Sequence, residues 1–190
     1  GLCPGRIVNE DRHTCRVVGS AGEIGASVAG RLRHHAKSAA ALPKIGDWVA
    51  YAPLPGEHKG VIQHVLPRAT QLVRKIAGRE TSEQVLATNV DIAFVVQSMD
   101  QTFKARRLER FMVMAHEGGI RPVVVLNKAD LCTDADALVA EAQAAAGDAL
   151  IIVTSAKNRR GLKQLVSLIQ PGQTVVFIGT SGVGKSTLIN

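Results

Sequence analysis

Near its carboxyl end the 190-residue chain reads Gly179, Thr180, Ser181, Gly182, Val183, Gly184, Lys185, Ser186, Thr187. This stretch matches the pattern G-x-x-x-x-G-K-[ST] of the phosphate-binding P-loop, and it follows an apolar run at 174–178 that predicts a strand. Its glycines allow backbone N–H groups to approach phosphate closely, at the start of a helix. We therefore predict that residues 179–187 bind phosphate. Lys185 would be the catalytic cation at the β- and γ-phosphates, and the hydroxyl of Ser186 would ligate Mg²⁺.

Apolar runs and amphipathic stretches alternate from residue 81 onward. This alternation predicts an α/β domain whose parallel strands are joined by right-handed helical crossovers. Ligands of such sheets bind beyond the carboxyl ends of the strands. The strands are expected at 91–97, 121–126, 149–153 and 174–178, and the helices at 104–117, 134–146, 162–169 and from 185.

The loop after the expected strand 121–126 reads Asn127, Lys128, Ala129, Asp130, which resembles the NKxD element of GTPases. In that element the aspartate accepts hydrogen bonds from guanine N1–H and from the exocyclic amine, and the lysine stem packs along the base. Adenine lacks this pair of donors, so the carboxylate of Asp130 would be left desolvated and unpaired beside it. The resemblance therefore favours GTP over ATP.

A second polar loop follows the expected strand 149–153. It reads Thr154, Ser155, Ala156, Lys157 and resembles the SAK element, whose backbone N–H contacts guanine O6. The alternative is that both loops are ordinary solvated connections. The predicted guanine-binding residues are Asn127, Lys128, Asp130, Ser155, Ala156 and Lys157.

The order of these motifs differs from that of ordinary small GTPases, in which the P-loop comes first. Here the loops at 127–130 and 154–157 precede the P-loop. A circular permutation accounts for this order, because the termini of compact domains often lie close together and a new break in a surface loop is tolerated. The second domain is therefore expected to be a circularly permuted P-loop GTPase domain.

The amino-terminal part consists of short runs rich in Val and Ile that turn residues separate. This pattern predicts a small all-β barrel, since closure removes exposed strand edges. A flexible basic loop is expected at 34–44, and the polar segment 78–83 marks a boundary between domains 1–80 and 81–190. The strands are expected at 6–8, 14–18, 24–32, 47–51, 60–65 and 71–75.

The net charge of +7 is concentrated in the amino-terminal part: residues 1–80 hold 12 Lys and Arg against 6 acids, and residues 81–190 hold 11 against 10. A basic domain attracts polyanions by releasing their counterions, although a basic surface can also serve solubility alone. Trp48 and Tyr51 are too few aromatics for base stacking, and Trp48 is expected in the core. We therefore predict contact with folded RNA through phosphates. The candidate contacts are Arg31, Arg33 and Lys37.

The sequence argues against several other classes of protein. Its apolar runs are far shorter than the roughly 20 residues that cross a bilayer, and its amino terminus shows no signal peptide, so we expect a cytoplasmic protein. Three cysteines without a C-x-x-C pair argue against a disulfide framework. The adjacent His34 and His35 lack the spacing of a zinc site.

Four short motifs stand at Gly46–Val49, Asn89–Asp91, Arg107–Arg110 and Gly179–Asn190. Together they resemble the ribosome-small-subunit-dependent GTPases of the RsgA or YjeQ type. This resemblance covers nearly the whole chain, and it implies that the barrel is an OB-fold that contacts ribosomal RNA. It also implies hydrolysis of GTP to GDP with Mg²⁺ during late maturation of the small ribosomal subunit, the nucleotide state controlling engagement with that subunit. We expect a monomer.

The chain departs from the family pattern after the P-loop. The switch and D-x-x-G segments and the carboxy-terminal zinc domain do not follow Asn190, so zinc is expected only in that further part, and these 190 residues alone are not expected to turn over GTP. One alternative is an RNA-binding assembly module whose nucleotide site is not used catalytically. Another is a permuted GTPase of the large-subunit type, which the amino-terminal strands disfavour.

Overall fold

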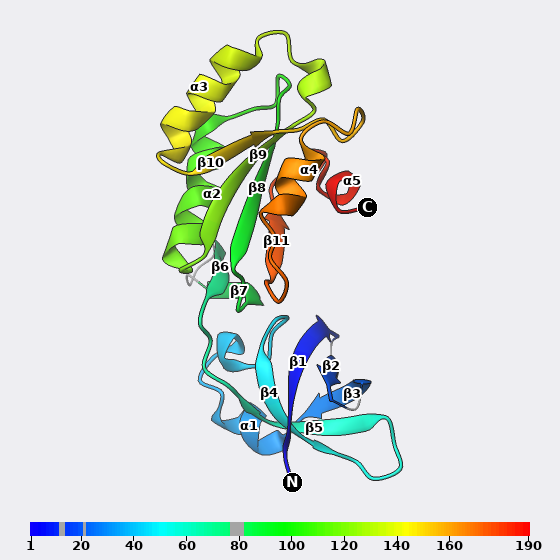
Figure 1. The fold of residues 1–190 in the computed structure, drawn as a ribbon. Helices are drawn as coiled ribbons and strands as arrows, with labels where there is room; N and C mark the ends of the chain where they lie inside the picture. Colours follow the sequence, from blue (N-terminus) through cyan, green and yellow to red (C-terminus); the bar gives the residue numbers. More distant parts are fainter. Residues whose placement is uncertain (12–13, 21, 77–81) are drawn as a thin grey trace. The chain divides into compact units, whose positions relative to one another are not determined.

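The computed structural model describes residues 1–11, 14–20, 22–76 and 82–190 (Figure 1). Contacts among these residues divide the chain into two compact units, Gly1–Asn89 and Val90–Asn190. The domain boundary expected between residues 80 and 81 lies outside the described residues, and the compact units divide at a later position.

In the described part of the first unit, five strands close into a barrel in the order β1-β2-β3-β5-β4. Neighbouring strands pair antiparallel, except that β3 and β5 run parallel. Alternate residues face the interior, where Ile7, Val17, Tyr51 and Ile62 are buried. The expected small barrel is therefore confirmed. Its strands are Cys3–Glu10 (β1), Thr14–Gly19 (β2), Gly22–Val28 (β3), Trp48–Pro53 (β4) and Lys59–Val65 (β5).

The prediction of one continuous strand at 24–32 is wrong for its second half. Strand β3 ends at Val28, and a short helix, α1 (Gly30–His35), follows it. Leu32 lies four residues after Val28, and both side chains pack against the barrel core. A spacing of four places two residues on one face of a strand as well as of a helix, so the apolar pattern alone did not show where the strand ends.

The loop expected to be flexible at 34–44 contains a 3-10 helix, η1 (Ala39–Ala41). Its end is held by Arg68, whose guanidinium donates hydrogen bonds to the carbonyl oxygens of Ala40 and Leu42 at 2.7 and 3.1 Å. A side chain distant in the sequence therefore orders this loop.

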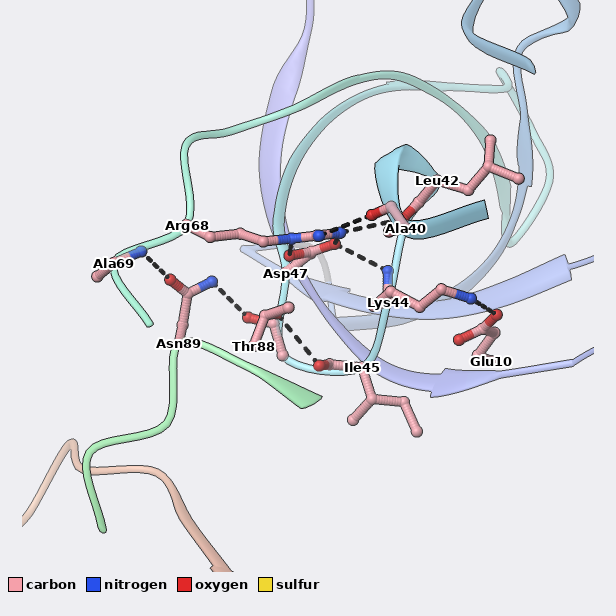
Figure 2. A network of polar contacts seen from close by, with 11 residues as sticks. Glu10, Ala40, Leu42, Lys44, Ile45, Asp47, Arg68, Ala69, Thr88 and Asn89 are labelled. Carbon is pink, nitrogen blue, oxygen red and sulfur yellow. Dashed lines mark hydrogen bonds and ion pairs between the residues drawn. The ribbon is translucent and has the colours of Figure 1, made fainter. Parts of the chain in front are cut away.

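The same guanidinium forms a two-armed ion pair with Asp47, with Nε–Oδ1 and Nη2–Oδ2 distances of 2.8 Å each (Figure 2). The Asp47 side chain is fully buried, and its carboxylate also accepts a hydrogen bond from the backbone N–H of Lys44 at 2.8 Å. The Lys44 ammonium in turn pairs with Glu10 at 2.5 Å. Because a buried charge must be paired, this network fixes the approach of the chain to β4.

Trp48 was expected in the core, and this expectation is wrong. Alternation along β4 turns Val49 and Tyr51 into the barrel, so Trp48 faces outward and is 44% exposed. Arg6, its register partner on β1, holds its guanidinium carbon 5.3 Å from the centre of the indole ring. This is the geometry of a cation–π contact on the barrel surface.

Strand β6 (Gln71–Ile76) confirms the strand expected at 71–75, but its antiparallel partner β7 (Ser82–Thr88) was not anticipated. Of the polar segment expected as the boundary, Ser82 and Glu83 begin β7, and residues 78–81 lie outside the described residues. Asn89, just after β7, donates to the carbonyl of Gly46 at 2.9 Å and accepts from the backbone N–H of Ala69 at 2.9 Å. These bonds explain why the first unit extends to Asn89.

The second unit is built on a parallel sheet with the strand order β10-β9-β8-β11. Every residue of the central strand β8 is buried, as expected for a strand covered on both faces. In Figure 1, α2 and α3 lie on one face of the sheet and α4 and α5 on the other. The strands are Ile92–Ser98 (β8), Arg121–Asn127 (β9), Leu150–Val153 (β10) and Val175–Ile178 (β11), and the helices are Ala105–Glu117 (α2), Ala129–Leu131 (η2, 3-10), Ala135–Ala146 (α3), Leu162–Ser167 (α4) and Lys185–Ile189 (α5).

Two further observations concern the described residues only. None of their helices combines the length and apolar character needed to span a membrane. They also contain no group of three or more His, Cys, Asp or Glu side chains arranged to hold a metal ion.

Candidate functional site

The P-loop connects β11 to α5, as the sequence predicted. Its backbone has positive φ at Gly179 (151°), Gly182 (83°) and Gly184 (96°), a region that favours glycine. A Cβ atom at Gly184 would collide with the side-chain amide of Asn127, and one at Gly179 would collide with the carbonyl of Val96. The loop can therefore pack against β8 and the end of β9 only with glycine at these two positions.

The Lys185 side chain folds back over the loop. Its ammonium group donates hydrogen bonds to the carbonyl oxygens of Gly179 and Thr180 at 3.0 and 2.8 Å. An ammonium group has three N–H donors, so one remains for a phosphate oxygen. The arrangement fixes a positive charge within the loop that is predicted to bind phosphate.

Asn127 ties together the loops that follow three different strands. Its side-chain N–H donates to the carbonyl of Val183 in the P-loop at 3.0 Å. Its side-chain oxygen accepts from the Thr154 hydroxyl at 3.1 Å and from the backbone N–H of Ala156 at 3.3 Å. Asn127 is only 2% exposed. The residue predicted to contact guanine therefore serves in this structure to hold the surrounding loops in place.

The loops after β9 and β10 also meet through Asp130 and Ser155. The Ser155 hydroxyl donates to the Asp130 carboxylate at 2.5 Å, while the backbone N–H of Asn158 donates to the Ser155 hydroxyl at 3.2 Å. The hydrogen bond from Ser155 lowers the pKa of Asp130, and the nearby charges of Lys157 and Lys128 lower it further. Asp130 is therefore an ionised acceptor on the surface of the site.

A pocket of about 300 Å³ lies where these loops converge. Its volume is at the lower end of the range for small-molecule sites. It brings together residues from the ends of β9 and β10 and from the P-loop with its helix: Asn127, Lys128, Asp130, Leu131, Ala156, Lys157, Gly184 and Thr187.

Two features of the site were missed by the sequence analysis. Leu131 lines the pocket and is 58% exposed, so it offers apolar surface to a flat ring. Asp100, just beyond β8, forms an ion pair with Lys128 at 3.3 Å. The signal for Asp100 was available: it follows a buried strand of the parallel sheet, as the loops at 127–130 and 154–157 do.

The chemistry of the loop is compatible with a magnesium ion. Ser186 follows Lys185 in the first turn of α5 and is exposed. A hydroxyl oxygen is a hard ligand of the kind that Mg²⁺ prefers, and in nucleotide sites the remaining ligands are mostly phosphate oxygens and water. Ser186 therefore fits the predicted role of holding magnesium beside the phosphates.

The candidate RNA contacts belong to the first unit. Arg31 and Arg33 lie on α1 and Lys37 follows it, and all three are exposed. Residues two apart on a helix point about 200° apart, so Arg31 and Arg33 face different sides of α1. The helix thus spreads its positive charge around its surface.

The model of the RsgA GTPase family matches residues 65–190. The chain belongs to the RsgA GTPase family. Curated relatives of the family include the small ribosomal subunit biogenesis GTPase RsgA of Opitutus terrae, which is 42% identical over 98% of this chain and 53% of its own length. The RsgA 2 protein of Lactiplantibacillus plantarum is 42% identical over 100% of this chain and 53% of its own length. The chain therefore spans about half the length of the curated RsgA relatives that it matches.

Solved structures of similar proteins cover all of the chain. YjeQ from Thermotoga maritima matches with a TM-score of 0.75 and 28% identity over 64% of its own length. YloQ, described as a circularly permuted GTPase, matches with a TM-score of 0.69 and 26% identity over 63% of its own length. These RsgA-type neighbours and the strand order confirm the expected fold: an OB-like barrel followed by a circularly permuted GTPase domain.

Proposed function

We propose that this chain carries the guanine-nucleotide site of a GTPase that acts in late maturation of the small ribosomal subunit. One observation carries the proposal: a single pocket joins the P-loop to the two loops that resemble guanine-reading elements. The curated relatives are named small ribosomal subunit biogenesis GTPases. We infer that the nucleotide state controls engagement with the subunit, in a cytoplasmic monomer whose zinc site belongs to a further carboxy-terminal part.

At the base end of the pocket, recognition rests on Asp130 and its neighbours. Its ionised carboxylate accepts hydrogen bonds from the N1–H and the exocyclic amine of guanine. Ser155 keeps the pKa of Asp130 low and orients the carboxylate, while Leu131 supplies apolar surface beside the ring. Ala156 and Lys157 line the same pocket. Guanine O6 is an acceptor, and a backbone N–H of this loop would be its donor.

At the phosphate end, Lys185 and the backbone of the P-loop bind the β- and γ-phosphates. The lysine ammonium is already held by two loop carbonyls, so it offsets the growing phosphate charge with little reorganisation. Ser186 would hold magnesium, which supplies electrostatic stabilisation of the phosphates when bound. Hydrolysis breaks the bond between the γ-phosphorus and the β–γ bridging oxygen, with water as the nucleophile.

The decisive experiment measures GTP hydrolysis by the complete gene product, alone and with purified small ribosomal subunits. We expect a large rise in rate with subunits that is specific for GTP over ATP. The Lys185→Ala variant serves as the control, since it removes the cation from the phosphates and should abolish the rise. If GTP is hydrolysed at a rate that ignores the subunit, the nucleotide site stands and the ribosomal partner has to be given up. Binding of GTP without hydrolysis, even with subunits, would instead support the RNA-binding module whose site is not used catalytically.

The basic barrel is proposed to contact ribosomal RNA through Arg31, Arg33 and Lys37. Replacing all three by Ala should weaken binding to the small subunit. It should also reduce the slope of log K against log salt concentration by about two, because each of the three lost phosphate contacts releases somewhat less than one counterion. Subunit binding is measured by co-sedimentation at several salt concentrations.

A matched control changes the same number of charges on the second unit, with Lys104, Arg106 and Arg110 replaced by Ala. These three residues are also exposed. An equal loss of salt dependence in both triple variants would mean that the effect reflects net charge, and it would contradict a contact at α1.

A further inference from the structure

The end of strand β8 lies beside two of the loops that form the pocket. In the sheet β8 lies between β9 and β11, so its carboxyl end is flanked by the loop at 127–130 and by the P-loop. Ser98, the last residue of β8, is the register partner of Asn127. The backbone N–H of Met99 donates to the carbonyl of Asn127 at 2.7 Å. The residues that follow β8 are therefore held against the base-reading loop.

Asp100 is the charged residue in this segment, and its carboxylate is held by its own neighbours. The Ser98 hydroxyl donates to one carboxylate oxygen at 2.5 Å. The hydroxyl and the backbone N–H of Thr102 donate to the other oxygen at 2.5 and 2.9 Å. These bonds, that from Ser98 first, lower the pKa of Asp100 well below its usual range, although burial acts in the opposite direction. Asp100 is thus a fixed negative charge at neutral pH.

The partner of this fixed charge is Lys128. Its ammonium lies 3.3 Å from the Asp100 oxygen that Ser98 also contacts. The backbone of Lys128 has φ of 64°, in the left-handed region, so the extended conformation of β9 ends before this residue. Lys128 also lines the nucleotide pocket. Its flexible side chain is therefore fixed at both ends, by its backbone conformation and by Asp100.

We propose that Asp100 is a positioning residue for base recognition: it anchors the Lys128 ammonium so that the aliphatic stem forms one wall for the purine ring. This inference rests on the proposed guanine-nucleotide site. A free lysine side chain would lose rotamer freedom when ordered against a base, and the anchor removes part of that cost before the nucleotide arrives. Asp100 itself contacts no nucleotide atom in this scheme.

The test uses the complete gene product and titrates a fluorescent GDP. We expect Asp100→Asn to raise the dissociation constant about fivefold, which is the effect of losing a partly exposed ion pair. Asp136→Asn is the matched control, since it removes the same charge from an exposed position on α3, and it should leave the constant unchanged. Asp100→Ser, which still offers an acceptor to Thr102, is the second variant and should show the same weakening.

A double-mutant cycle separates positioning from a general effect on the loop. If Asp100 acts through Lys128, Asp100→Asn should have no further effect in a Lys128→Met background. An equal weakening in both backgrounds, or GDP binding by both Asp100 variants that is as tight as in the parent, would overturn the inference. Failure of the parent protein to prefer GDP over ADP would instead refute the proposed nucleotide site, so the two failures are distinguishable.

Discussion

Asp130→Asn is expected to change the preferred base from guanine to xanthine. The Asp130 carboxylate offers two acceptors, which match N1–H and the exocyclic amine of guanine. An asparagine amide offers one acceptor and one donor, which match N1–H and the C2 carbonyl of xanthine. Because a mismatched buried donor or acceptor is left unpaired, affinity for GDP should fall at least about a hundredfold while affinity for xanthosine diphosphate rises. Competition binding with both nucleotides measures the exchange.

The control for this experiment is Asp148→Asn, which removes an equal charge from an exposed position of the same unit. It should leave both affinities unchanged. In the Asp130→Asn variant the new amide oxygen can still accept from the Ser155 hydroxyl, so the loop should keep its position. A variant that binds both diphosphates as the parent does would rule out Asp130 as the base-reading residue.

Arg68→Ala is expected to destabilise the first unit by about 3 to 5 kcal/mol, since it leaves the buried carboxylate of Asp47 without its counter-charge. It also removes the donors that bind the carbonyls of Ala40 and Leu42. Trp48 is the only tryptophan in the chain and lies on β4, so its fluorescence during denaturant unfolding reports on the barrel.

Arg16→Ala provides the comparison for this prediction. Arg16 also pairs with a carboxylate, that of Glu23, at 2.9 Å, but both side chains are about half exposed. An exposed pair contributes little, so the unfolding midpoint should barely move. If the Arg16 and Arg68 variants lose similar stability, the buried network does not hold the barrel together as described.

Features of this chain that depend on local interactions can be predicted from its sequence, whereas features that depend on distant contacts cannot. The P-loop was predicted because its glycines and Lys185 act through local backbone geometry, which a short pattern records. The expectation for Trp48 failed because alternation does not say which face of β4 points into the barrel. The expectation for 24–32 failed because a few apolar residues fit both alternation and helical spacing. In both cases only packing against the barrel decides.

Most of the candidate site could be assembled in outline, because parallel strands bring their carboxyl ends to one edge. The loops at 127–130 and 154–157 were therefore expected near the P-loop, and one pocket now contains residues from all three. Asp100 was missed because no motif marks it, although it too follows a buried strand of the parallel sheet. Its role depends on β8 lying next to β9.

The sequence by itself determined the class of each domain and the order of the motifs, since these follow from periodicity and from short local patterns. The residues that would read a guanine nucleotide were predicted from the resemblance of two loops to the NKxD and SAK elements. Only the tertiary structure decided what depends on distant partners. Asn127 holds three loops together, Asp100 anchors Lys128, and Arg68 neutralises a buried Asp47. A hydrogen bond or ion pair forms wherever folding brings two groups within about 3 Å, and separation along the chain carries no record of that distance.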